Sequence, residues 1–420
     1  MRTFLVIWFG QLMSTTGSYM SNFALSIWAW EQTESATTLA LINFFFLLAS
    51  IPTTLVAGVI VDRYNRKYLM MLGDAIAALS TLIILGLSLT HSLHIWHLYG
   101  LSAVSGGFSQ IQGLAYSTSI TLIVPPHHYG RAGSLRSIVH YGSSIFAPAL
   151  AGSLYPILGL RGILAIDLST FAIAIATLLI VTLPQPTLST KSELIGQQLS
   201  FGFRYIVKKP ELFALLGITS LFWFAHDLSG SIYKPTILAR SGGDTQVLGN
   251  VVAAAGIGGV LGGIITSIWS GNQRHLNKLL WGFMGAGICK TIFGFGQSVK
   301  VWLPAQFCAS LHFPWLSSSE NALWLSHVPA SLQGRVFAAN SLILQLLSAI
   351  ASLLGGWLAD RVFEPAMQPG TPLAGMFGQI LGTGQGAGMA FLYIIAVASL
   401  FLIGLIGYAI PALRRLDCSP

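Results

Sequence analysis

The 420-residue sequence contains very little charge. Only 8% of its residues are charged and 54% are hydrophobic, whereas a soluble domain has about 25% charged residues. So few charges cannot cover a water-exposed surface, and the mean hydropathy of +0.71 agrees. The composition therefore excludes an ordinary soluble domain and predicts an all-α membrane protein with about 12 transmembrane helices.

The sequence also lacks the residue patterns of several kinds of binding site. The three cysteines, Cys289, Cys308 and Cys418, show neither a disulfide framework nor metal-ligand spacing. No phosphate-binding loop of the P-loop type is present, which argues against ATP as the energy source. We therefore expect no cofactor and no metal. We interpret the net charge of +8 as basic cytoplasmic loops rather than as a nucleic-acid surface.

Long apolar runs set the architecture. The first run, Phe4 to Trp30, is too long for a signal-peptide core, so we expect it to be the first span. The polar stretch between spans 6 and 7 predicts a cytoplasmic linker at 184–210, between an N-terminal six-helix half (1–183) and a C-terminal half (211–420). The predicted spans are 4–30, 36–61, 68–90, 93–123, 135–157, 161–183, 211–238, 246–270, 277–298, 300–326, 334–359 and 387–411.

The basic residues predict the topology. With the N-terminus inside, 15 of the 21 Lys and Arg residues fall on the cytoplasmic side, five fall outside, and Lys290 lies within a span. This bias predicts that both termini are cytoplasmic and that the number of spans is even. We expect a multi-pass protein of a bacterial-type inner membrane, and a monomer.

An internal repeat relates the two predicted halves. Val124-Pro125-x4-Gly130-Arg131 recurs 204 residues later as Val328-Pro329-x4-Gly334-Arg335. Each copy lies between the fourth and fifth spans of its own half. Two parallel six-helix repeats are typical of one large class of secondary transporters.

The loop between spans 2 and 3 contains the most specific motif. It runs from Gly58 through Asp62, Arg63, Arg66 and Lys67, and resembles the G-x-x-x-D-R-x-x-R-K signature of the major facilitator superfamily. Together with VPASLQGRVFA (328–338) and ADRVFEPAM (359–367), it makes the chain similar to the drug-antiporter branch that includes macrolide-efflux and siderophore-export proteins.

The resemblance implies that this loop is a cytoplasmic latch. Asp62 would then face the start of span 11, near Gly334 and Arg335. Gly58 would allow a neighbouring helix to approach closely. The alternative is that the basic residues only fix the topology.

Polar residues recur along one face of several spans. In spans 1, 4 and 7, polar residues are spaced three or four positions apart, which places them on one side of each helix. The resemblance implies that these three spans line the central cavity. A cargo-binding cavity is one interpretation of the stripes, and interhelical hydrogen bonding without a ligand is the other. The candidate cavity residues are Gln11, Thr15, Ser18, Asn22, Gln110, Trp223 and Ser231.

Ionisable residues within spans are the candidates for coupling. Asp227, beside His226, lies near mid-depth on the stripe of span 7, where a proton or a cationic cargo can compete for its carboxylate. Its alternative is a static pair with Lys234. Glu320 is a second candidate near the cytoplasmic end of span 10, and Asp74 is expected to be shallow and to pair with Arg131 or Arg136.

These features predict a secondary active transporter, with proton-coupled efflux of lipophilic or amphiphilic small molecules as the leading hypothesis. Span 4 has Ser109 where many proton antiporters have an arginine, so coupling through that position is not expected. An uptake permease is the alternative within transport. A membrane enzyme or a scaffold is the alternative outside it, although we see no loop with more than two acidic residues. We therefore expect no enzymatic activity.

Overall fold

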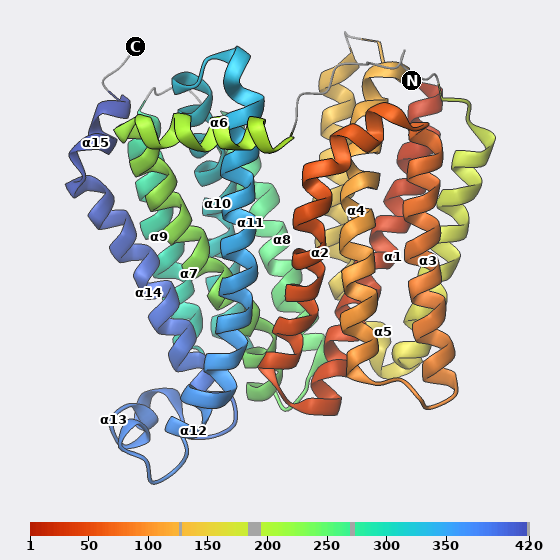
Figure 1. Cartoon of the computed structure of the whole chain (residues 1–420). Coiled ribbons are helices and arrows are strands. Elements are labelled where there is room, and N and C mark those ends of the chain that lie inside the picture. The colour runs from red at the N-terminus through yellow and green to blue at the C-terminus, as the bar shows by residue number, and fades with distance from the viewer. Residues whose placement is uncertain (126–127, 184–194, 269–273, 418–420) are drawn as a thin grey trace. The chain divides into compact units, whose positions relative to one another are not determined.

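The computed structural model describes residues 1–125, 128–183, 195–268 and 274–417. These residues are almost entirely helical, and no strand occurs among them. The chain divides into two compact units (Figure 1). The first contains residues 1–33 and 41–192, and the second contains residues 34–40 and 193–420.

Five helices build the first unit. α1 packs along the second part of α5, and a Cβ added at Gly10 or Gly17 would collide with α5 side chains. Such small residues let transmembrane helices approach closely. The helices are α1 (Arg2–Thr33), α2 (Ala36–Arg63), α3 (Arg66–Leu89), α4 (Ile95–Ile123) and α5 (Tyr129–Ile180).

Helix α5 consists of two helices joined at a sharp break. Gly159 has φ 62° and ψ −173°, a backbone conformation that other residues rarely adopt. Pro156 removes a backbone donor just before it. The break separates the predicted spans 135–157 and 161–183.

The second unit contains the remaining helices. α6, on one end of this unit in Figure 1, lies in the C-terminal part of the predicted linker, whereas α12 and α13 lie at the opposite end. Its elements are α6 (Ile195–Lys208), α7 (Pro210–Arg240), α8 (Thr245–Ile268), α9 (His275–Phe295), α10 (Val299–His327), α11 (Ala330–Leu358), a π-helical turn (Ala359–Phe363), α12 (Glu364–Ala366), α13 (Pro372–Leu381), α14 (Ala387–Ala409), α15 (Pro411–Arg414) and a 3₁₀ turn (Arg415–Asp417).

The fold confirms the predicted class. Eleven helices in the described ranges have at least 21 residues, and α5 counts twice, which gives twelve long rods. Seven of the described helices are long and apolar enough to cross a membrane by length and composition. Helices α1, α4, α9 and α10 are not among the seven. They contain many of the polar residues identified in the sequence, which lower their hydropathy.

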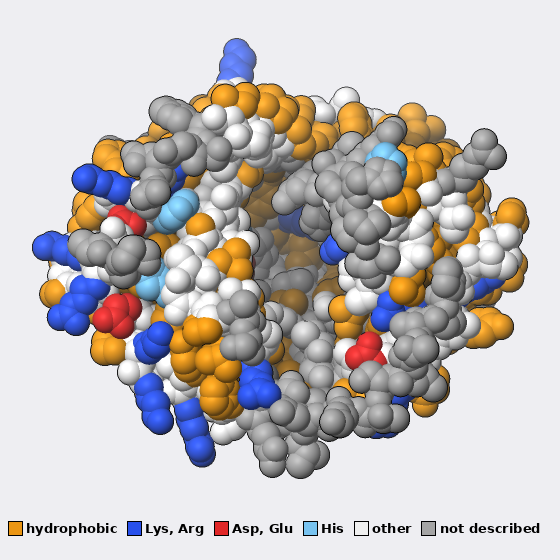
Figure 2. Space-filling view, turned by 90° about the horizontal axis from the view of Figure 1, so that it is seen from above, with side chains coloured by type: hydrophobic (Ala, Val, Ile, Leu, Met, Phe, Trp, Pro, Cys, Tyr) orange, Lys and Arg blue, Asp and Glu red, His pale blue; other side chains and the backbone are white. Residues whose placement is uncertain are grey.

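The outer surface fits a bilayer environment. Large apolar side chains such as Ile157, Ile180 and Trp281 are exposed to the surroundings, as expected of lipid-facing residues in a protein with this much apolar surface. Figure 2 shows the end of the molecule at which α6 lies, where Lys and Arg side chains gather and acidic ones are few. This face has the charge expected of a cytoplasmic surface.

Candidate functional site

The polar stripe of α7 meets aromatic and acidic side chains of α10. His226 Nδ1 and Asp227 Oδ1 are 3.1 Å apart. Trp223 Nε1 donates a hydrogen bond of 3.2 Å to Glu320 Oε2. The ring of Phe313 packs edge to face against His226, with centroids 4.8 Å apart. We call these five residues the α7–α10 cluster.

Lys290 of α9 adds a cation to this cluster. Its side chain is only 6% exposed, and Nζ lies 5.5 Å from the centroid of the Phe313 ring. It interacts electrostatically with both His226 and Asp227. The sequence offered no partner for Lys290, because α9 and α7 are distant in the chain. The structure brings its charge close enough to interact electrostatically with Asp227.

The charge balance of the cluster explains what it can do. With Lys290 protonated and His226 neutral, the carboxylates of Asp227 and Glu320 leave one negative charge in excess. Glu320 is 9% exposed, so this charge lies in a poorly solvated environment. One proton or one monovalent cation would neutralise it, which lowers the cost of keeping these groups within a membrane.

The residues of the predicted cavity differ in their burial and in their hydrogen-bond partners. Gln11 is buried and donates to Asp74, whereas Thr15 and Ser18 are half-buried and Asn22 is exposed. Gln110, Trp223 and Ser231 are half-buried. Ser231 Oγ bonds to the Leu228 carbonyl of its own helix. Their cargo-binding role stays a prediction.

The loop between α2 and α3 separates into exposed and buried parts. Asp62 is 61% exposed, and its carboxylate lies 3.9 Å from Arg66 Nη2. Arg63 is also exposed. A Cβ added at Gly58 would meet none of the described atoms within 4 Å. These three residues thus present an open surface, and their latch role remains a prediction.

The other two basic residues of the motif hold the first unit together. Arg66 Nη1 donates to the Thr118 carbonyl of α4 at 2.8 Å. Lys67 Nζ donates to the Val181 carbonyl at the end of α5 at 2.7 Å. Cations at the carbonyl ends of helices interact favourably with the helix dipole. The start of α3 is therefore tied to the C-terminal ends of α4 and α5.

The repeated motif is described only in its second copy. The side chain of Arg131 and the surroundings of Gly130 lie outside the described residues. Arg335 lies over the ring of Phe201 of α6, at 5.4 Å from its centroid. A Cβ added at Gly202 would collide with the Arg335 carbonyl, so α6 packs directly against the start of α11.

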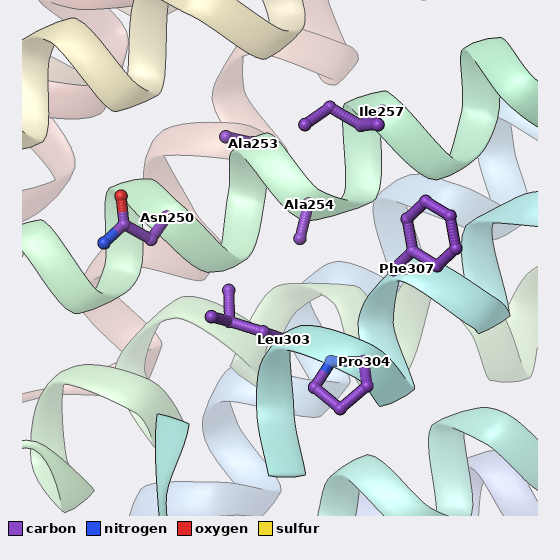
Figure 3. Close-up of a pocket in the computed structure, with 7 residues that line it drawn as sticks. All are labelled: Asn250, Ala253, Ala254, Ile257, Leu303, Pro304 and Phe307. Atoms are coloured by element: carbon purple, nitrogen blue, oxygen red, sulfur yellow. The ribbon is translucent and has the colours of Figure 1, made fainter. Parts of the chain in front are cut away.

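A cavity that the sequence did not suggest lies between α8 and α10 (Figure 3). Its volume is about 440 Å³, and only Asn250 among its lining residues is polar. The other lining residues are Ala253, Ala254, Ile257, Leu303, Pro304 and Phe307. Small residues along α8, which appear in the sequence as an ordinary apolar run, leave this space open.

Comparison with known proteins decides the family. The family model described as Major Facilitator Superfamily matches residues 7–352. The chain belongs to the major facilitator superfamily. It is therefore a multi-pass membrane transporter of small molecules and not an enzyme.

Relatives within this superfamily include exporters. The chain is 23% identical to macrolide efflux protein A of Streptococcus pyogenes, over 86% of this chain and 90% of that protein. It is 21% identical to the multidrug efflux pump Tap of Mycolicibacterium fortuitum, over 98% and 97%. The enterobactin exporter EntS of Shigella flexneri is 22% identical over 67% of each chain.

Solved structures show the same fold. A bacterial homologue of the iron transporter ferroportin, in an inward-facing state, matches with a TM-score of 0.71 and 15% identity, over 97% of this chain and 99% of that one. The nucleoside transporter NupG also matches with a TM-score of 0.71, at 11% identity over the same shares. These matches confirm the predicted major facilitator fold.

Proposed function

We propose that this chain is a proton-coupled exporter of lipophilic or amphiphilic small molecules, such as drugs, siderophores or peptide products. It acts as a monomer in a bacterial-type inner membrane, with both termini in the cytoplasm. The observation that carries the coupling is the α7–α10 cluster, in which the two acids Asp227 and Glu320 lie with one described cation, Lys290. A site with one excess negative charge can exchange a proton for a weakly cationic cargo.

We infer the class of cargo from the side chains that surround Asp227, Glu320 and Lys290. Trp223, Phe313 and Phe222 line or back the cluster, and aromatic faces bind both apolar groups and cations. The cavity between α8 and α10 is almost entirely apolar. Neutral and weakly basic, fairly apolar molecules suit such surfaces, whereas a multiply charged sugar phosphate does not. The efflux functions in the names of three relatives support the export direction.

A vesicle experiment tests this function. Purified protein is reconstituted into liposomes with radiolabelled erythromycin, a lipophilic weak base, and uptake is compared with and without an imposed pH gradient. We expect faster accumulation than in protein-free liposomes, which take up a weak base passively, on the more acidic side and opposite to the flow of protons, and its loss when a protonophore is added. Equal rates with and without the gradient would contradict proton coupling. Accumulation in the direction of proton flow would instead indicate an uptake permease.

Asp244→Asn provides the matched control. The Asp244 carboxylate accepts hydrogen bonds from the backbone amides of Gln246 and Val247 at the start of α8, outside the cluster. Asparagine caps a helix about as well as aspartate. This variant therefore makes the same acid-to-amide change without affecting the proposed coupling site, and it should transport like the wild type.

A further inference from the structure

A second buried acid, in the first unit, is not used by the function proposed above. Asp74 of α3 is 1% exposed. Its Oδ1 accepts hydrogen bonds from Gln112 Nε2 at 2.6 Å and from Ser14 Oγ at 3.2 Å. Its Oδ2 accepts one from Gln11 Nε2 at 3.1 Å. Three neutral side chains from two other helices thus converge on one carboxyl group.

The backbone is shaped to bring these groups together. A Cβ added at Gly73, next to Asp74, would come within 2.6–2.9 Å of three side-chain atoms of Gln112. Any larger residue would push α4 away from α3 at this level. Gln11 and Ser14 are one turn apart on α1, so both face the same point.

Charged partners are lacking around Asp74 in the part of the chain that the structure describes. Arg66, two turns earlier on α3, donates to the Thr118 carbonyl. On α5, Arg136 is exposed and acts on Tyr116 of α4, while Asp167 accepts a hydrogen bond from Thr81. On α1 the nearest titratable group in the chain is Tyr19. The expected pairing with Arg136 is therefore not what holds Asp74, and the side chain of Arg131 lies outside the described residues.

This arrangement can hold the carboxyl group in both charge states. The three donors stabilise the anion. When a proton binds Oδ2, the Gln11 amide can turn over, so that its Oε1 accepts the new O–H where its Nε2 had donated. Both oxygens already lie within 3.2 Å of donors, which leaves no room for a metal ion with its own shell of oxygen ligands.

We propose that Asp74 is a second proton-binding site, with Gln11 as the amide that reorients when the proton binds. The proposal deepens the proton-coupled function above and rests on it for its role in transport. Gln11 belongs to the polar stripe of α1, and Gln112 lies two residues from Gln110 on α4. A proton at Asp74 therefore changes hydrogen bonds on two helices that contain candidate cargo-binding residues.

Infrared difference spectroscopy of the purified protein tests proton binding without any transport measurement. A protonated carboxyl group absorbs as a C=O stretch that disappears when the pH rises. We expect Asp74→Asn to remove one such pH-dependent band and Asp167→Asn, a buried acid of the same unit, to retain it. A wild-type spectrum that is unchanged by Asp74→Asn would overturn the proposal.

A second variant leaves the acid in place, in case Asp74→Asn does not fold. Gln112→Leu removes the closest donor to the anion, so the same band should titrate about one pH unit higher. An unmoved titration would overturn the proposal.

Transport measurements then separate the two claims. In the vesicle assay, Asp74→Asn should lower gradient-driven accumulation at least tenfold, while Asp167→Asn has little effect. Normal accumulation in Asp74→Asn would overturn the coupling role of this site. Absence of gradient-driven flux in the wild type would contradict the proposed function, and the infrared result would still decide whether Asp74 binds a proton.

Discussion

Trp223 Nε1 donates its hydrogen bond to Glu320 Oε2 across the interface between α7 and α10. The bond joins a residue of the α7 polar stripe to the second candidate coupling acid, 97 positions later in the chain. It also gives the buried carboxylate of Glu320 a hydrogen-bond donor within the protein.

The coupling role is expected to differ between the two acids. Asp227→Asn is nearly isosteric and removes the carboxylate nearest His226 and Lys290, so it should abolish gradient-driven accumulation while downhill exchange continues. Glu320→Gln should have the smaller effect, because its amide can still accept from Trp223. Transport in vesicles with and without a gradient measures both. Normal accumulation in Asp227→Asn together with loss in Glu320→Gln would transfer the coupling role to Glu320.

Trp223→Phe should weaken transport while keeping the aromatic surface. The change removes one hydrogen bond to a charged group, worth about 1.5–3 kcal/mol, and leaves Glu320 buried without its donor. We expect gradient-driven transport to fall about tenfold or more. Trp281→Phe, at an exposed position on α9, is the control and should transport normally. Equal transport rates in the two variants would mean that the hydrogen bond to Glu320 does not contribute to transport.

In the loop between α2 and α3, we expect some residues to contribute to stability and others to the rate of transport. Arg66→Ala removes a buried charge-assisted bond to α4, so the melting temperature should fall by about 4–8 °C. Asp62→Asn and Arg63→Ala affect exposed side chains and should leave melting unchanged while slowing transport. Thermal unfolding and vesicle transport of the same preparations distinguish these effects. Wild-type transport in both exposed variants would reduce this loop to a determinant of topology.

The carboxylate of Asp360 is expected to stabilise the first turn of α2. The residues of this turn belong to the second unit. It accepts hydrogen bonds from the Ala36 and Thr37 amides at 3.0 and 2.8 Å, and from Ser35 Oγ at 2.6 Å. Asp360→Ala removes a helix cap worth about 1 kcal/mol, so hydrogen exchange at these amides should speed up about fivefold. Asp360→Asn retains an acceptor and should exchange more slowly than Asp360→Ala. Equal hydrogen-exchange rates in the wild type and Asp360→Ala would show that the cap does not stabilise the start of α2.

Topology can be tested with single cysteines, after the three native cysteines are replaced by alanine. Ser200→Cys on α6 is exposed and should react with a membrane-impermeant maleimide only after the cells are opened. Gln368→Cys, near α12 at the opposite end of the second unit, should react in intact cells. The reverse pattern would invert the topology.

The sequence by itself determined the properties that are local in the chain. A run of apolar residues predicts a helix in the membrane whatever lies beside it, so the long rods and the major facilitator fold were predicted correctly. The α2–α3 motif was recognisable because its residues are consecutive. The helical character of α6 was missed, because its polar composition resembles a linker.

Only the tertiary structure decided which polar groups meet. Asp74 accepts hydrogen bonds from Gln11 and Gln112, Lys290 interacts electrostatically with Asp227, and Asp360 caps a helix more than 320 positions earlier. Helical periodicity tells which residues share a face of one helix, but not which helix that face packs against. A buried carboxylate must be satisfied by whichever donors its neighbouring helices present, so its partners and its charge are fixed only when the helices pack together.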